Sequence, residues 1–388
     1  MKRLGASMKT KRSYQMCTVT VLDTTDPDIT FDENGVSHYV HYFNKHIGPK
    51  LNQYNKQDLQ NLCQQIKKSN KRSEYDCIIG ISGGIDSAYL LYVVKKELGL
   101  NPLAVHIDAG WNSELAVQNI EEVITKLNVD LYTHVIDWEE MRDLQLAFLK
   151  SHVPNQDIPQ DHCFFAFLHK FALKKNIKYL FTGSNNQSES ILPQAWGYSA
   201  MDATHLKAIH KQFGTMKLKN YPIISFFDYF VRCKILKQVQ VVKPLNYLTY
   251  NKAEALKVLK SEFNWKEYTG KHGESRFTKF FQNYYLPTKF GFDKRKAHLS
   301  SLILAGQITR EQALEELQKP LYDDKELEED KAFIAKKLQI SVDELESIIH
   351  KEPKQHFDYP TNQTVYGFLR KLYFKFSGRE DHLNDYKK

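Results

Sequence analysis

Residues 82 to 87 read Ser-Gly-Gly-Ile-Asp-Ser and place hydroxyls, a carboxylate and two adjacent glycines in one short turn. An apolar run at 77–81 precedes the turn, and apolar residues at helical spacing follow Asp86. Adjacent glycines let the backbone come close to a ligand, and the first amides of the following helix favour an anion, above all phosphate. A carboxylate fits such a site when it holds a metal ion that the phosphates also hold. The alternative is an ordinary strand-to-helix turn with glycines for packing.

Strand-like and helix-like runs alternate from Tyr75 onward, which predicts a parallel sheet with helices on both faces. The expected strands are 76–81, 103–107, 131–136 and 178–182, and the expected helices are 86–98, 113–127, 139–150 and 160–175. Two further helices are expected over 203–213 and about 222–239. Ligands of such sheets bind beyond the carboxyl ends of the strands.

Two more strand ends carry polar residues, so we expect them to share a crevice with the turn at Ser82. The first is the stretch from His106 to Asn112, where Asp108 either binds ribose hydroxyls or a metal-bound water, or caps the next helix. The second is the stretch from Gly183 to Glu189. Gly183 would let the backbone approach a nucleotide, and Asn185 lies in the same loop.

The chain length and composition indicate one large domain with additions. We expect an N-terminal β hairpin at 1–40, an α/β domain at 41–250 and a helical C-terminal region at 251–388. No apolar run has the ~20 residues that a membrane span needs. Five cysteines form no Cys-x-x-Cys pair, and the odd number fits a reducing cytoplasm. The formal charge of +8 is spread over 388 residues, so it is weak support for a nucleic-acid partner.

A segment at 268–296 mixes basic and aromatic residues. It would form a nucleic-acid platform, a pocket for a sugar nucleotide or phosphate, or a structural segment with buried aromatics. Its candidate anion-binding residues are Lys271, Arg276, Lys279 and Arg295.

The string Ser-Gly-Gly-x-Asp-Ser after a buried strand resembles the pyrophosphate loop of the ATP pyrophosphatase (PP-loop) superfamily. The Lys-Ser/Thr ending of a Walker loop is absent. The resemblance implies an adenine nucleotide alpha hydrolase-like fold that binds ATP with Mg²⁺. Asp86 would help to hold the metal, and the residues assigned to ATP are Gly80, Ser82, Gly83, Gly84, Asp86, Ser87, His106, Asp108 and Gly183.

Longer stretches resemble the N-acetyl sugar amidotransferase (WbpG/PseA-like) family. They are Cys17 to Gly35, His106 to Val117, Asp157 to His162, Gly183 to Glu189, Trp196 to His210 and Glu274 to Ser301. The resemblance implies that ATP adenylylates the acetamido oxygen of an N-acetylated sugar, and that ammonia then replaces the activated oxygen to give an acetamidino group. Catalysis is assigned to Asp86, Ser87 and Glu189, and substrate binding to Asn185, Glu189, Trp111, Lys271, Arg276, Lys279 and Arg295.

The resemblance also implies partners, because the sequence shows no glutaminase signature. Ammonia would come from a separate glutaminase subunit through a cyclase-like barrel subunit. Family members carry four N-terminal cysteines in two pairs that are typical of a zinc site. Here only Cys17 remains, with Thr20, Ser37 and Val40 at the other positions, so we expect no zinc.

The alternative function is a PP-loop tRNA-modifying ligase or thiolase. It would need an RNA-binding surface and, for sulfur chemistry, paired cysteines. We therefore expect a cytoplasmic amidotransferase of bacterial surface-polysaccharide synthesis (lipopolysaccharide O-antigen or nonulosonic acid), without a nucleic-acid partner.

Overall fold

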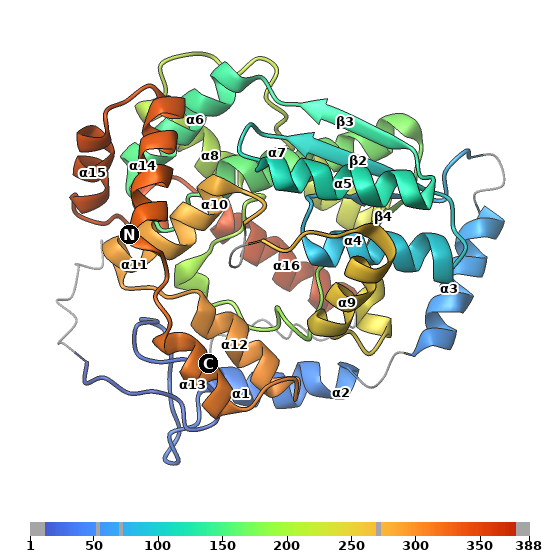
Figure 1. Cartoon of the computed structure of the whole chain (residues 1–388), viewed down its shortest axis with the longest axis horizontal. Helices are drawn as coiled ribbons and strands as arrows, with labels where there is room; N and C mark the ends of the chain where they lie inside the picture. Colours follow the sequence, from blue (N-terminus) through green and yellow to red (C-terminus); the bar gives the residue numbers. More distant parts are fainter. Residues whose placement is uncertain (1–11, 52–54, 70–72, 269–272, 378–388) are drawn as a thin grey trace.

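The computed structural model describes residues 12–51, 55–69, 73–268 and 273–377. Within them the chain forms a five-stranded parallel sheet with helices on both faces, followed by a helical C-terminal region (Figure 1). The strand order is β3-β2-β1-β4-β5. The strands are β1 Cys77–Gly80, β2 Pro102–Asp108, β3 Leu131–Val135, β4 Tyr179–Phe181 and β5 Gln240–Val242. The predicted α/β class with a parallel sheet is confirmed.

The helix that we expected over about 222–239 is shorter in the structure, and a strand that we did not predict, β5, follows it. The observed helix is η4, Asp228–Ile235, and β5 pairs with β4. The amide of Gln240 donates to the carbonyl of Lys178 at 2.7 Å, and the amide of Thr182 donates to the carbonyl of Val242 at 3.0 Å. A three-residue edge strand has too few positions for a recognisable period, so its neighbour in the sheet decides it.

Alternate strand residues enter two separate apolar cores, one on each face of the sheet. Ile78 packs into one core, and its neighbours Cys77 and Ile79 pack into the other. The first core contains side chains of α6 (Trp138–Ser151) and α7 (Ile158–Lys175). The second contains side chains of α3 (Lys56–Ser69), α4 (Ile85–Tyr92), α5 (Glu114–Leu127) and α9 (Lys252–Phe263). All carboxyl ends of the strands therefore point to one edge, between the helix layers.

Helices make up most of the remaining chain, as expected. They include α8 Ala203–Phe213, α10 Arg276–Phe280, η6 Phe281–Tyr285, α11 Leu286–Phe290, α12 Arg295–Leu304, α13 Arg310–Gln318, α14 Asp324–Leu338, α15 Val342–His350 and α16 Gln363–Ser377. The shorter helical segments are η2 Val93–Glu97, η3 Gln194–Trp196, η5 Pro244–Tyr247 and η7 His356–Asp358. Helix starts follow the sequence signals, because Thr309 forms a complete capping box and Asn251 and Ser341 cap their helices. None of the described helices is long and apolar enough to span a bilayer. The domain boundaries near 40 and 250 stay predictions.

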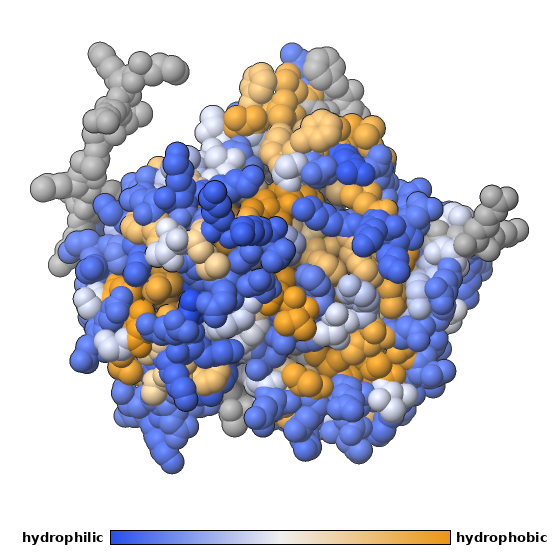
Figure 2. Space-filling view, turned by 90° about the horizontal axis from the view of Figure 1, so that it is seen from above, coloured by the Kyte–Doolittle hydropathy of each residue, from blue (hydrophilic) through white to orange (hydrophobic). Residues whose placement is uncertain are grey.

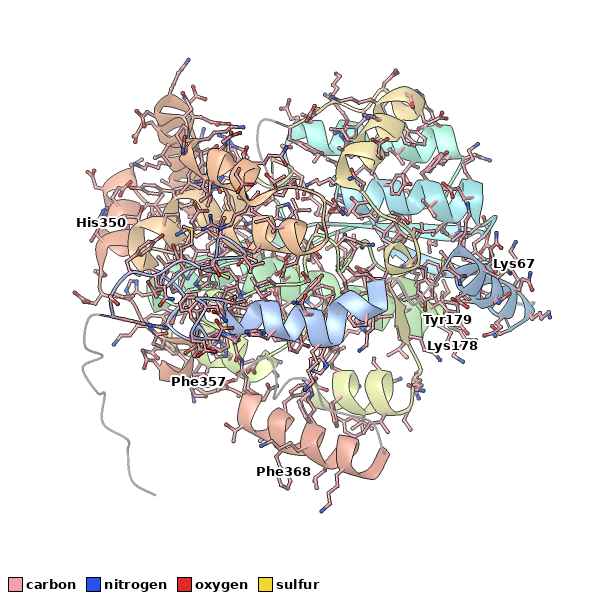
Figure 3. All side chains as sticks on the ribbon, turned by 90° about the horizontal axis from the view of Figure 1, so that it is seen from below. Lys67, Lys178, Tyr179, His350, Phe357 and Phe368 are labelled. Carbon is pink, nitrogen blue, oxygen red and sulfur yellow. The ribbon has the colours of Figure 1, made fainter. Side chains whose placement is uncertain are left out.

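The N-terminal segment is not the β hairpin that we expected. Among the described residues before α1 (His38–Tyr42), only isolated antiparallel bridges occur, at Met16–Asp23 and Phe31–Ser37. The carboxylates of Asp23, Asp26 and Asp32 accept nearby backbone amides, and such local bonds compete with a strand ladder. Helices α1, η1 (Phe43–Ile47) and α2 (Gly48–Leu51) then run as one rod across the lower face (Figure 3).

Cys17 and two positions that replace the other cysteines come together in this segment. The amides of Thr20 and Ser37 both donate to Cys17 Sγ, at 3.4 and 3.3 Å, and all three residues are fully buried. Two hydroxyls, on Thr20 and Ser37, have no hydrogen-bond partner among the described residues. Cys17 therefore serves as a hydrogen-bond acceptor for the backbone of this segment. The absence of zinc stays a prediction.

A buried ion pair ties this segment to the C-terminal region. Asp23 is fully buried, and its carboxylate accepts from the Lys296 ammonium on α12 and from the Tyr14 hydroxyl at 2.9 Å. Burial alone would raise the pKa of Asp23, but the hydrogen bonds from Lys296 and Thr25 lower it below its usual value. A lowered carboxyl pKa contributes stability above about pH 4, and this stability is lost as the pH falls through the lowered pKa.

We expect Lys296→Met to destabilise the fold by about 3–5 kcal/mol at neutral pH, because Asp23 would stay buried without its cation. The free energy of unfolding from urea titrations measures this. The decrease in the free energy of unfolding as the pH falls below about 4 should also be smaller in the variant. Lys319→Met, which removes an exposed ion pair with Glu316, serves as the control and should cost less than about 1 kcal/mol. Equal losses for the two variants would contradict the assigned role of Lys296.

Candidate functional site

The turn after β1 has the geometry of an anion cradle. The Ser82 amide donates to Ser87 Oγ at 3.3 Å, the Gly84 amide donates to Ser82 Oγ at 3.3 Å, and Ser87 Oγ donates to the Gly84 carbonyl at 3.0 Å. Ser82 is exposed and Ser87 is half-buried. The first amides of α4 have no acceptor within the helix, and they open toward this turn. The cradle can therefore bind a phosphate group through amides and hydroxyls.

Three of the predicted glycines lie in close contact with neighbouring elements. Gly83 has φ +84°, and a Cβ added there would lie 3.0 Å from Ala116 Cβ on α5. A Cβ at Gly183 would lie 2.9 Å from the carbonyl carbon of Asp86. A Cβ at Gly80 would lie 3.1 Å from a methyl group of Leu168. The backbone of Gly183 thus approaches the first turn of α4 directly, where we expected it to approach the nucleotide.

Asp86 and Glu189 come together around a tyrosine that sequence reasoning missed. The hydroxyl of Tyr250 donates to Asp86 Oδ1. Burial, the Asp86 charge and the Glu189 charge all raise the pKa of Tyr250, so its hydroxyl stays a proton donor. Asp86 is half-buried and Glu189 is exposed. Two of the three predicted catalytic residues therefore face the same space.

The loop after β2 is held by its own side chains. Nδ1 of His106 donates to the Ile81 carbonyl at 2.9 Å, which leaves Nε2 to accept from the Asn112 amide at 3.1 Å. Asp108 Oδ1 accepts from the Gly110 amide at 2.7 Å and from the Asn112 side chain at 3.2 Å. Ser113, and not Asp108, caps α5. His106 and Asp108 thus shape the loop in this structure, and ATP binding by them stays a prediction.

Trp111 does not face a substrate in this structure. Its side chain is 1% exposed, and its ring packs edge-on against Trp138 at 5.2 Å between centroids. The ammonium of Lys337 lies 5.3 Å from the Trp111 ring and donates to the Gly110 carbonyl. Trp111 therefore packs between the β2 loop and α14, and its role in substrate binding stays a prediction.

The loop after β4 is also built by local hydrogen bonds. Asn185 is 2% exposed, and its Oδ1 accepts from the amide and the hydroxyl of Ser188, both at 2.9 Å. The Asn186 amide donates to Asn246 Oδ1 at 2.8 Å. Asn185 therefore fixes the turn that presents Glu189, and its role in substrate binding stays a prediction.

The C-terminal region closes the crevice directly against the cradle. The Ser113 amide donates to the Glu274 carbonyl at 2.9 Å, and the Glu274 carboxylate lies 3.6 Å from the position of a Cβ on Gly84. The Tyr268 hydroxyl donates to the Gly83 carbonyl at 2.7 Å and accepts from Asn119 at 3.1 Å. Burial raises the pKa of Tyr268, which keeps this donor protonated. Neither Tyr268 nor Glu274 was among the predicted site residues.

Two further carboxylates lie beside this junction, at the start of α7. Thr278 donates to Asp157 Oδ1 at 3.1 Å, and Ser275 donates to Gln160 Oε1 at 3.4 Å. Burial, opposed by the Lys294 charge and by hydrogen bonds, raises the pKa of Asp157. Burial and the Asp157 charge raise the pKa of Asp161, against the attraction of Lys294. The junction therefore holds two buried carboxyl groups whose pKa values are both raised.

The predicted anion-binding cations bind protein groups in the structure. Arg276 Nε donates to Asp330 Oδ1 at 2.7 Å, and its guanidinium stacks on the Phe333 ring. Lys279 pairs with Glu326. Arg295 pairs with Asp293 at 2.8 Å and donates to the Lys319 carbonyl at the end of α13, also at 2.8 Å. These contacts join the C-terminal helices and give no support to sugar-phosphate binding, and Lys271 lies outside the described residues.

The residues at the cradle fit ATP with Mg²⁺. Asp86 supplies a carboxylate oxygen beside the amides and hydroxyls that would hold phosphates. No group of three or more potential metal ligands occurs among the described residues. A Mg²⁺ ion here would therefore take most of its ligands from phosphates and water, as is usual for this ion.

Two regions of the chain match known protein families. Residues 57–223 match the family model for NAD synthase, and residues 274–373 match the model described as LPS biosynthesis protein WbpG-like, C-terminal domain. The fold and the cradle thus define an ATP pyrophosphatase (PP-loop) domain of the NAD synthase type. The chain joins this domain to a WbpG-like C-terminal domain.

Individual relatives match shorter parts of the chain. An uncharacterized protein from Methanocaldococcus jannaschii is 33% identical over 76 residues, and tRNA(Ile)-lysidine synthase from Chlamydia pneumoniae is 29% identical over 136 residues. The first match covers 20% of this chain and 27% of the length of its relative. The second match covers 34% of this chain and 39% of the length of its relative. An NH3-dependent NAD synthetase from Campylobacter jejuni is 21% identical, covering 53% of this chain and 83% of its own, with a TM-score of 0.28. Because this score is low, the fold class rests on the sheet and on the family matches.

We expect Tyr250→Phe to lower kcat for pyrophosphate release about ten- to a hundredfold, because a hydrogen bond to a charged group contributes about 1.5–3 kcal/mol. Steady-state kinetics with ATP measure this. Tyr89→Phe is the matched control, since the Tyr89 ring packs against Tyr250 at 5.8 Å between centroids. Unchanged kcat in Tyr250→Phe would show that Asp86 does not depend on this donor.

We expect Asp161→Asn to flatten the dependence of the melting temperature on pH. A carboxyl pKa raised by folding means that the folded chain binds more protons, so stability falls as the pH rises from about 4 toward neutrality. Removal of the charge should raise the melting temperature by several degrees near pH 8 and by less near pH 5, measured by calorimetry. Asp343→Asn, on the exposed start of α15, should give no such difference. A variant that is less stable than the natural chain at the higher pH would refute the assignment.

Proposed function

We propose that the chain is an ATP-dependent amidotransferase that converts the acetamido group of an N-acetylated, nucleotide-linked sugar to an acetamidino group. The reaction would proceed through an adenylylated amide and would belong to lipopolysaccharide O-antigen or nonulosonic acid synthesis. The WbpG-like match and the PP-loop domain support the class of reaction. The sugar acceptor comes from the resemblance to N-acetyl sugar amidotransferases.

One observation carries the proposal most directly. The WbpG-like region begins at Glu274, and this residue lies against Gly84 in the phosphate cradle. The region that distinguishes the chain from NAD synthases thus forms a wall of the ATP crevice. A group that accepts AMP has to lie beside the α-phosphate, so this wall is where the acceptor would bind.

The cradle supports cleavage between the α- and β-phosphates. The amide oxygen of the sugar attacks the α-phosphorus, the bond to the bridging oxygen breaks, and pyrophosphate leaves. The amides at the start of α4 and the hydroxyls of Ser82 and Ser87 hold the departing pyrophosphate. Bound Mg²⁺ would neutralise part of the phosphate charge. Asp86, oriented by the hydrogen bond from Tyr250, would help to position the phosphates.

The second step needs ammonia and a proton acceptor. Ammonia attacks the activated carbon, the bond from carbon to the AMP oxygen breaks, and the nitrogen loses a proton. Asp157 and Asp161 are suited to accept it, because burial raises the pKa of each carboxyl toward neutrality. Glu189, exposed beside Tyr250, is the second candidate base.

Ammonia in this proposal comes from a separate glutaminase subunit acting with a cyclase-like barrel subunit. The resemblance to N-acetyl sugar amidotransferases is the support for both partners. Free ammonium salts would replace them in an assay when the crevice is open to solvent.

A tRNA-modifying ligase is the second candidate function. The match to a tRNA(Ile)-lysidine synthase over 34% of this chain favours it. The WbpG-like region and the intramolecular pairing of Arg276, Lys279 and Arg295 weigh against an RNA surface at the crevice.

We expect pyrophosphate release from ATP to require both ammonium and an N-acetylated sugar nucleotide. A coupled phosphate assay measures release, and mass spectrometry of the sugar detects replacement of the amide oxygen by nitrogen. Asp86→Asn should reduce the rate by at least about a hundredfold without a change in melting temperature, since it removes the carboxylate charge and keeps its shape. Asp343→Asn is the matched control and should behave like the natural chain. Release that depends on tRNA, or that proceeds in Asp86→Asn, would overturn the proposal.

A further inference from the structure

Strand β3 leaves one edge of the sheet open (Figure 1). Leu131, Tyr132 and Val135 are 39%, 39% and 67% exposed, and the strand contains no Lys, Arg, Asp or Glu. Natural edge strands are commonly protected by charge, proline, a bulge or shortness. The opposite edge, β5, is only three residues long. The unprotected edge is therefore the one at β3.

The register of β3 shows which backbone groups point outward. The Ala104 amide donates to the Asp130 carbonyl at 3.0 Å, and the Ile136 amide donates to the Asp108 carbonyl at 2.9 Å. In a parallel pair, every second residue of the edge strand turns its amide and carbonyl to the neighbour. Residues 130, 132, 134 and 136 therefore face β2. The outward-facing backbone groups belong to Leu131, Thr133 and Val135.

These outward groups match a second copy of themselves. In an antiparallel pair centred on Thr133, Thr133 lies opposite Thr133, and Leu131 lies opposite Val135. Each of these pairs exchanges two backbone hydrogen bonds, because both members present their polar groups to the free edge. Tyr132 then lies opposite His134, so aromatic and apolar side chains meet across the pair.

The charges beside the edge favour the same antiparallel arrangement. Helix α5 begins with Glu114 and has Lys126 in its last turn. Helix α5 runs opposite to the strands, so two-fold pairing of β3 places the acidic start of α5 in one copy near the basic end of α5 in the other.

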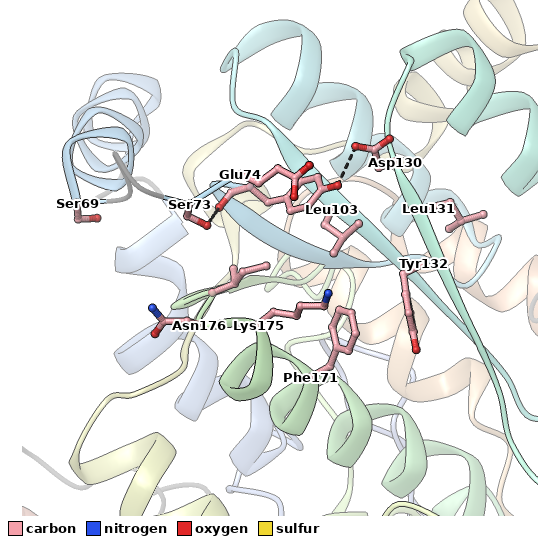
Figure 4. A pocket seen from close by; sticks show the side chains of 12 residues that line it. Ser69, Ser73, Glu74, Leu103, Asp130, Leu131, Tyr132, Phe171, Lys175 and Asn176 are labelled. Atoms are coloured by element: carbon pink, nitrogen blue, oxygen red, sulfur yellow. Dashed lines mark hydrogen bonds between the residues drawn. The ribbon is translucent and has the colours of Figure 1, made fainter.

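A cavity at the start of β3 and the surrounding surface extend the contact. The cavity has a volume of about 540 Å³, and Figure 4 shows Tyr132, Phe171 and Lys175 around it. Pairing centred on Thr133 would place the segment after Val135 of a second copy at its mouth. The side of the molecule with β3 shows apolar surface between polar residues (Figure 2).

We propose that the chain forms a two-fold symmetric dimer by antiparallel pairing of β3 with β3 of a second copy, so that one sheet continues through both. A second copy is the occupant because the register, the facing side chains and the charges are complementary to themselves. This inference does not depend on the proposed function.

Light scattering after size-exclusion chromatography of the full chain tests the dimer. The natural chain should have twice the mass of one chain, and Val135→Lys should have the mass of one, because the two lysines would lie opposite Leu131 at the buried pair. Val241→Lys makes the same change on β5, where Val241 is 43% exposed, and should stay dimeric. A monomeric natural chain, a dimeric Val135→Lys variant or a monomeric Val241→Lys variant would each overturn the proposal.

Cross-linking tests the pairing of β3 directly, without a variant in which the dimer has to dissociate. All five native cysteines are buried, so Thr133→Cys supplies an accessible thiol. The two thiols would lie across one strand pair, with about 5.5 Å between Cα atoms, within reach of a short bismaleimide. Thr133→Cys should give a covalent dimer, whereas Val241→Cys should not. A monofunctional maleimide shows whether the new thiol is accessible. If the Thr133→Cys variant reacts fully with it but forms no covalent dimer with the bismaleimide, pairing at β3 is excluded.

Discussion

The close approach of three backbone segments at the carboxyl ends of β1 and β4 is the constraint on which the site depends. Gly83 lies against Ala116 on α5, and Gly183 lies against Asp86 on α4, at distances that leave no room for a Cβ. Any side chain at either glycine would push the start of α4 away from the sheet. The start of α4 carries both the free amides and the carboxylate of Asp86, so this packing determines where an anion can bind.

Carboxylates line the crevice around this contact. Different groups compensate the cost of burying each carboxylate. Asp86 accepts a hydrogen bond from Tyr250, which keeps the charge in a partly buried place. Asp157 and Asp161 lie near one cation, Lys294, and their raised pKa values follow from burial. At the C-terminal helices, Asp330 instead pairs with Arg276 and Lys279. A tyrosine hydroxyl is the partner of Asp86 at the crevice, whereas arginine and lysine are the partners of Asp330 in the scaffold.

Local patterns were sufficient for most of the fold. The alternation of apolar runs predicted β1 to β4 and the helices between them. The failures lie where distant parts of the chain compete with local preference. β5 forms because β4 offers it a partner, and the N-terminal hairpin gives way to turns bonded by aspartate side chains.

The sequence by itself determined the phosphate cradle, because its glycines, hydroxyls and Asp86 lie within six consecutive residues and act through local backbone geometry. Only the tertiary structure decided which other groups share the crevice. Tyr250 and Tyr268 reach the cradle from 164 and 185 residues away, with no local pattern to mark them. It also decided that Arg276, Lys279 and Arg295 bind protein groups. The physical reason is that a charged side chain in a mixed basic and aromatic segment has the same local pattern whether its partner is a ligand or a carboxylate on a later helix.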